Sequence, residues 1–96
     1  MRAQATLEEM ERVFDEIKDM LPPSEYEAMA AYLEKGDSDR LWVCLVGYTW
    51  GLFSVKDPER FDEYWIRLGI TGELAIDMLD TCGRMASMFS RDPGHV

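Results

Sequence analysis

The sequence contains few histidines and cysteines, which many enzymes and metal sites use. It has one histidine, His95, and two cysteines, Cys44 and Cys82, which do not form a CxxC pair. Acid–base and nucleophilic catalysis usually require a histidine, or a cysteine or serine beside a base. Zinc sites need closely spaced Cys and His ligands. The sequence therefore predicts a protein that is not an enzyme and binds no metal and no cofactor, with both thiols buried and reduced.

Basic residues are also scarce. Ten Lys and Arg stand against 19 Asp and Glu, which gives the 96-residue chain a formal net charge of −9. Phosphate groups and anionic membrane surfaces both attract Lys and Arg, so this balance argues against direct nucleic-acid binding and against membrane docking. The stretch 61–80 loosely fits the spacing of a helix-turn-helix motif. Its second half, however, would present only acidic and uncharged side chains to DNA.

Long apolar runs and targeting signals are absent as well. The most apolar stretch, residues 41–55, would span about 22 Å as a helix, whereas a bilayer core is about 30 Å thick. The first 20 residues alternate charged and apolar side chains, which predicts no signal peptide. We therefore expect a cytoplasmic protein with a single acidic helical domain over 1–96, in which residues 1–5 and 91–96 are frayed.

Apolar periodicity and capping residues predict an all-α fold of about five helices. Apolar side chains recur at steps of three and four residues, and prolines or glycines separate the segments. Counting their capping residues, the expected helices cover 6–21, 24–36, 37–55, 57–69 and 71–92. Thr6 with Glu9, and Ser24 with Glu27, have the spacing of capping boxes.

The segment 41–55 is apolar on nearly every side. We expect it to form the buried central helix of a compact bundle, with Gly47 and Gly51 allowing a neighbouring helix to approach closely. A strand hairpin is the alternative, because its Trp, Val, Tyr and Phe residues favour strands. The length of the segment and its helical neighbours favour the helix.

Acidic side chains form a ridge along the first helix, opposite its apolar face. Successive members lie three, four and four residues apart, and like charges at such spacings cost a few tenths of a kcal/mol each. The ridge therefore does not strengthen the helix; it serves solubility or attracts a basic partner. The predicted partner-binding residues are Glu8, Glu11, Asp15 and Asp19, and more weakly Asp62 and Glu63.

These features favour a protein that binds another protein stoichiometrically. We expect it to inhibit a basic, nucleic-acid-binding partner such as a CRISPR effector or a nuclease. In size and charge only, the chain is similar to anti-CRISPR proteins of phages and mobile elements and to nuclease immunity proteins. No motif assigns it to a named family.

The alternative function is a homo-oligomeric structural or accessory subunit, with a homodimer as its simplest form. Aromatic and methionine side chains are enriched at protein interfaces, and this sequence has more of them than a small core can hide. The candidate contact residues are Trp42, Trp50, Trp65, Tyr26, Tyr32, Tyr48, Tyr64, Met78, Met85 and Met88.

Overall fold

The computed structural model describes the backbone of residues 2–90 and the side chains of residues 2–81. Within these residues the chain contains helices and no strands, which confirms the all-α prediction and rules out the hairpin over 41–55. The elements are α1 (Leu7–Ile17), the 3-10 turn η1 (Lys18–Met20), α2 (Pro23–Lys35), α3 (Ser38–Phe53), α4 (Pro58–Arg67) and α5 (Gly72–Ser90).

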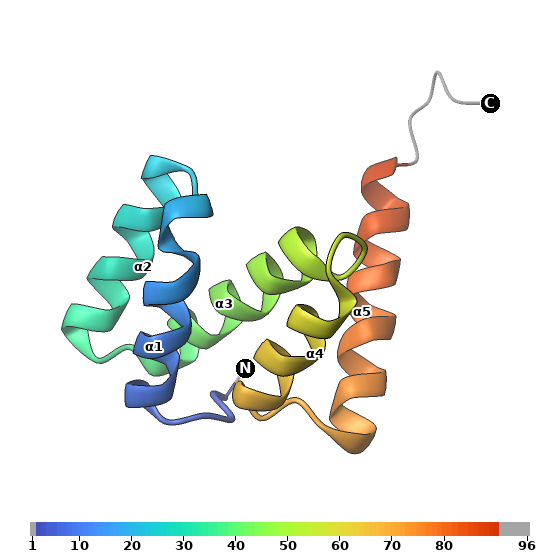
Figure 1. The fold of residues 1–96 in the computed structure, drawn as a ribbon, viewed down its shortest axis with the longest axis horizontal. Coiled ribbons are helices and arrows are strands. Elements are labelled where there is room, and N and C mark those ends of the chain that lie inside the picture. Colours follow the sequence, from blue (N-terminus) through green and yellow to red (C-terminus); the bar gives the residue numbers. More distant parts are fainter. Residues whose placement is uncertain (1, 91–96) are drawn as a thin grey trace.

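Helix α3 is central, as predicted, and α1, α2 and α4 all pack against it. Figure 1 shows α1 and α2 together at one end of α3, with α4 and then α5 at the other. Trp42 of α3 is fully buried, and its indole Nε1 donates a hydrogen bond of 2.8 Å to the Leu68 carbonyl at the end of α4. This bond satisfies the polar atom of a large buried ring and fixes α4 relative to α3.

Helix α4 follows its sequence signals closely. Asp57 is the N-cap, and its carboxylate accepts a hydrogen bond of 3.3 Å from the Arg60 backbone N–H. Pro58 occupies the first helical position, where its missing N–H costs nothing. The predicted inward residues are all buried: Phe61, Tyr64, Trp65 and Leu68.

The helical hairpin formed by α1 and α2 differs from the prediction at its turn. Helix α1 ends at Ile17 and not at Leu21, because Leu21 precedes a proline and takes an extended conformation with φ −91° and ψ 144°. The N-cap of α2 is Pro22, so Ser24 lies inside the first turn and does not cap the helix. Proline at the first helical position replaces the predicted side-chain cap.

Helix α3 is buried on most sides, as predicted, but the prediction that a neighbouring helix packs closely at Gly47 and Gly51 is wrong for the described residues. Gly47 and Gly51 are exposed, and a Cβ atom added to either would have no heavy atom of the described side chains within 4 Å. The residues that α3 buries lie on its other face, where it contacts α1, α2 and α4. The residues that α3 buries there are Leu41, Trp42, Leu45, Val46, Thr49 and Phe53.

The segment before α1 makes specific contacts, which differ from the frayed start expected for residues 1–5. The Ala3 backbone N–H donates a hydrogen bond of 2.8 Å to the Asp39 carboxylate at the start of α3. The Gln4 carbonyl lies directly against Gly69, which has φ +81° in the turn after α4. The other expected frayed segment, 91–96, lies outside the described residues.

Candidate functional site

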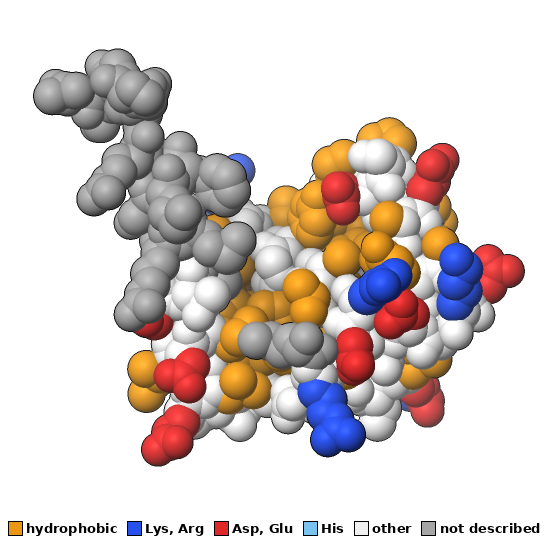
Figure 2. All heavy atoms as spheres, turned by 180° about the vertical axis from the view of Figure 1, so that it is seen from behind, with side chains coloured by type: hydrophobic (Ala, Val, Ile, Leu, Met, Phe, Trp, Pro, Cys, Tyr) orange, Lys and Arg blue, Asp and Glu red, His pale blue; other side chains and the backbone are white. Residues whose placement is uncertain are grey.

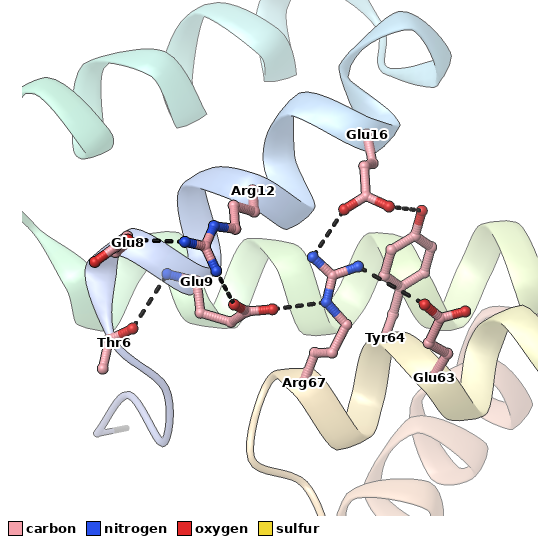
Figure 3. Close-up of polar contacts among 8 residues, drawn as sticks. All are labelled: Thr6, Glu8, Glu9, Arg12, Glu16, Glu63, Tyr64 and Arg67. Carbon is pink, nitrogen blue, oxygen red and sulfur yellow. Dashed lines mark hydrogen bonds and ion pairs between the residues drawn. The ribbon is translucent and has the colours of Figure 1, made fainter.

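Arg67, in the last turn of α4, lies between two glutamates of α1 (Figure 3). Its Nε donates a hydrogen bond of 2.6 Å to Glu9 Oε1, and its Nη2 lies 2.8 Å from Glu16 Oε2. Glu63, one turn earlier on α4, lies 4.0 Å from Nη1. Glu9 and Glu16 are two helical turns apart, so both face α4. One guanidinium therefore joins carboxylates from both helices.

Arg60 and Tyr64 extend this cluster towards α3. The Tyr64 hydroxyl donates to Glu16 Oε1 at 3.4 Å and accepts from Arg60 Nη2 at 3.1 Å. The Arg60 guanidinium also lies 4.6 Å from the centre of the Phe53 ring, a cation–π geometry. Both bases of α4 are thus engaged within the protein.

The ion pairs shift the protonation equilibria of the cluster. The hydrogen bond from Arg67 is the main cause that holds the pKa of Glu9 and of Glu16 below the ordinary glutamate value. The same two bonds raise the pKa of Arg67. These three groups are therefore charged at neutral pH.

The predicted acidic ridge is exposed but is not uniform. Glu8 pairs with Arg12 at 2.8 Å, and Asp15 lies 3.6 Å from Lys18. Glu11 is exposed and has no hydrogen bond or ion pair to any described residue. Asp19 lies in η1, beyond the α-helical spacing that placed it on the ridge. The continuous ridge is shorter than predicted; we call Glu8, Glu11 and Asp15 the α1 surface.

The two predicted acids of α4 face different neighbours. Glu63 joins the Arg67 cluster and so comes close to α1. Asp62 lies at a groove between α4 and α5, beside Trp65 and Ile66. The structure therefore connects Glu63 with α1 and separates Asp62 from it.

No protein-family model, curated protein or solved structure matches this chain. Its site must be interpreted from its own geometry.

An apolar groove of about 360 Å³ runs along the exposed face of α3. Figure 2 shows hydrophobic side chains gathered in the middle of the face opposite to the view of Figure 1. Burial raises the pKa of the Cys44 thiol in this groove, which disfavours the reactive thiolate. The lining residues are Val43, Cys44, Gly47, Tyr48, Trp50, Gly51 and Leu52.

Five of the seven predicted aromatic contact residues divide between the core and this groove, whereas Tyr26 is exposed and Tyr32 is half-buried outside it. Trp42, Trp65 and Tyr64 are buried core residues, whereas Trp50 and Tyr48 are half-buried and line the groove. Of the methionines named above, Met78 is buried, and the side chains of Met85 and Met88 lie outside the described part.

The sequence prediction missed most residues of the Arg67 cluster: of its charged members, it included only Glu63. A signal for the others existed: Glu9 and Glu16 are seven residues apart, and so are Arg60 and Arg67. Two helical turns separate the members of each pair, so they share one face of their helix. No group of three or more Asp, Glu, Cys or His side chains within residues 2–81 could hold a metal ion. Among the described helices, none is long and apolar enough to cross a membrane.

Proposed function

We propose that the protein acts without catalysis, by binding a basic partner protein through the α1 surface. The supporting observation is how charge is distributed around α1. Residues 7–20 contain six acids and two bases, and Arg67 of α4 forms ion pairs with Glu9 and Glu16 on the inner edge of the helix. Glu8, Glu11 and Asp15 remain on the outer edge, where solvent or a partner can reach them.

A rigid row of carboxylates suits a surface that normally binds phosphates. Side chains three and four residues apart on a helix have Cβ atoms about 5–6 Å apart, so the row presents closely spaced negative charges. Such a row attracts the Lys and Arg residues with which nucleic-acid-binding proteins contact phosphates. The proposed action is stoichiometric occlusion of a nucleic-acid site, as in a CRISPR effector or a nuclease.

Charge reversal of the α1 surface tests this proposal. The variant Glu8→Lys, Glu11→Lys, Asp15→Lys is compared with Glu27→Lys, Glu34→Lys, Asp77→Lys, which changes the net charge equally at other exposed positions. Binding to a purified RNA-guided effector nuclease and to a small basic nuclease is measured at 50 and 300 mM salt. We expect affinity to fall with salt, and to fall at least 100-fold more for the α1 variant than for its control.

Equal losses in the two triple variants would show that net charge and not the α1 surface governs binding. Failure of the unaltered protein to bind either nuclease at low salt would contradict the proposed class of partner.

The exposed face of α3 favours a second candidate, a homodimer that buries this groove. Residues 41–55 contain no charge, and Val43 is 48% exposed within them. Gly51→Lys places a charge on this face, where its Cβ would have no described atom within 4 Å. If the face forms a dimer, light scattering should show a dimer that Gly51→Lys converts to a monomer and that Ser24→Lys, at an exposed site of α2, leaves intact. A monomeric unaltered protein contradicts this candidate.

A further inference from the structure

A second groove, of about 330 Å³, lies between α4 and α5 and carries an acidic residue among apolar ones. Its walls include the rings of Phe61 and Trp65 and the side chain of Ile70. Ile66 and Leu79 also line it and are 63% and 44% exposed, so apolar surface extends outward from the groove. Asp62 places a carboxylate against this apolar lining.

The α4 edge of this groove is acidic. On α4, Glu59, Asp62 and Ile66 recur at steps of three and four residues and therefore share one face. Arg60 and Arg67, the bases of α4, are bound to Tyr64 and to the glutamates of α1 instead. Neither base of α4 is therefore engaged with Glu59 or Asp62.

We propose that this groove binds a basic amphipathic helix of a partner protein. The apolar face of that helix packs on Trp65, Ile66 and Leu79, while its Lys or Arg side chains reach Asp62 and Glu59. A helix fits better than a strand because both walls are helices and offer no free backbone edge, so the inserted segment must satisfy its own N–H and C=O groups. A positive flank is required because the α4 edge is acidic.

This inference goes beyond the proposed function, because it concerns another surface and a defined structural class of ligand. It does not depend on the α1 surface. The uncharged groove on α3 offers nothing that selects a basic helix over any other apolar segment.

The probe is a fluorescein-labelled 18-residue peptide of leucine and lysine with helical amphipathic spacing, titrated and followed by fluorescence anisotropy. A scrambled peptide of the same composition has the same charge without an apolar face, and a leucine–glutamate peptide has the face with the opposite charge. We expect the amphipathic lysine peptide to bind at least ten-fold more tightly than either. Equal affinity for the scrambled peptide would overturn the proposal, because charge alone would then explain binding.

Matched variants locate the binding surface. Asp62→Lys and Glu27→Lys make the same charge change at two exposed positions on different helices. We expect Asp62→Lys to weaken peptide binding at least five-fold, and Glu27→Lys to weaken it less than two-fold. Ile66→Ser changes no charge and removes exposed apolar surface, and it should weaken binding at least three-fold.

Circular dichroism shows whether each variant keeps its helical content, and Ile66 is exposed enough for its replacement to spare the core. Equal weakening by Asp62→Lys and Glu27→Lys, or full affinity in Ile66→Ser, would place the peptide elsewhere and overturn the inference. A loss of nuclease binding on reversal of the α1 surface has no bearing on these peptide results.

Discussion

Arg67 joins α1 to α4 through bonds that only the folded chain can make. Its side chain is 23% exposed, whereas Arg12, which pairs with Glu8 and Glu9 within α1, is 62% exposed. Partly buried charge-assisted hydrogen bonds stabilise more than exposed ones, because less water competes for the charged groups. The two arginines therefore form a natural comparison of buried and exposed ion pairs.

Replacing Arg67 with methionine should lower the free energy of unfolding by about 1–2 kcal/mol at pH 7, and Arg12→Met by less than about 0.5 kcal/mol. Urea unfolding measures both values. Because Arg67 lowers the folded-state pKa of Glu9 and Glu16, their stabilisation is present above the ordinary glutamate pKa of 4.5 and is lost as the pH falls below it. The difference between the unaltered protein and Arg67→Met should therefore shrink between pH 6 and pH 3. A difference that does not vary with pH would mean that these ion pairs do not stabilise the fold.

Substitutions at Gly69 and Gly36 allow the cost of backbone strain to be measured separately from the cost of a steric overlap. Both have positive φ, +81° and +71°, but only at Gly69 would a Cβ atom overlap the Gln4 carbonyl; at Gly36 it meets open space. Gly36→Ala should cost about 1 kcal/mol from the left-handed conformation alone. Gly69→Ala should cost at least about 2 kcal/mol, because the segment before α1 must also move. Thermal and urea unfolding compare the two; equal costs would show that this segment does not pack against the turn in solution.

At the scale of the element, α3 is joined to α4 by a buried hydrogen bond between side chains. Trp65 Nε1 donates to Thr49 Oγ1 at 3.0 Å, and this hydroxyl donates in turn to the Leu45 carbonyl at 2.7 Å. Thr49 is fully buried, so its hydroxyl is needed as the acceptor for the indole.

Thr49→Val keeps the shape of the side chain and leaves the Trp65 N–H without this acceptor. It should cost about 1–2 kcal/mol of unfolding free energy. In the background of Trp65→Phe, which removes the donor, the same substitution should cost markedly less. This double-mutant cycle, measured by urea unfolding, isolates the bond from other effects of each change. Equal costs in the two backgrounds would contradict the bond.

Most element boundaries could be predicted because they depend on nearby residues. Thr6 accepts a hydrogen bond from the Glu9 backbone, Asp57 caps α4, and Gly36 ends α2 with positive φ. The exposed face of α3 could not be predicted from its own sequence. A segment that is apolar on nearly every side carries no periodic signal, so the side that is covered depends on where the other helices pack.

The candidate site could be predicted only where it depends on the spacing of residues within one helix. Glu8, Glu11 and Asp15 share an outer face because helical spacing alone places them there. The contact of Arg67 with Glu9 joins residues 58 positions apart, and only the packing of α4 against α1 determines it. Asp62 separates from Glu63 because neighbouring helical positions point in different directions and, in this fold, meet different helices.

Over the molecule as a whole, the charges behind the net charge of −9 are unevenly arranged. Glutamates are paired with an arginine where α1 meets α4, and other acids face outward. Arg67 and Arg60 lie where α1 meets α4, whereas Glu8, Glu11 and Asp15 face outward on α1 and Asp62 lies at the α4–α5 groove. Such a distribution keeps a domain soluble and also provides surfaces for basic partners. Stability measurements can distinguish a surface maintained for binding from one that stabilises the fold.

Glu11→Lys makes that distinction. Glu11 lies four residues before Asp15 and three after Glu8, so its charge is repelled by both within α1. Reversing it should raise the free energy of unfolding by about 0.2–0.5 kcal/mol at low salt, and 1 M NaCl should remove the gain. Glu27→Lys on α2 changes the net charge equally but has no acid three or four residues away, so it should not stabilise. If Glu11→Lys stabilises the isolated protein and weakens nuclease binding, the acid serves binding at the expense of stability; a destabilised variant would show that Glu11 supports the fold.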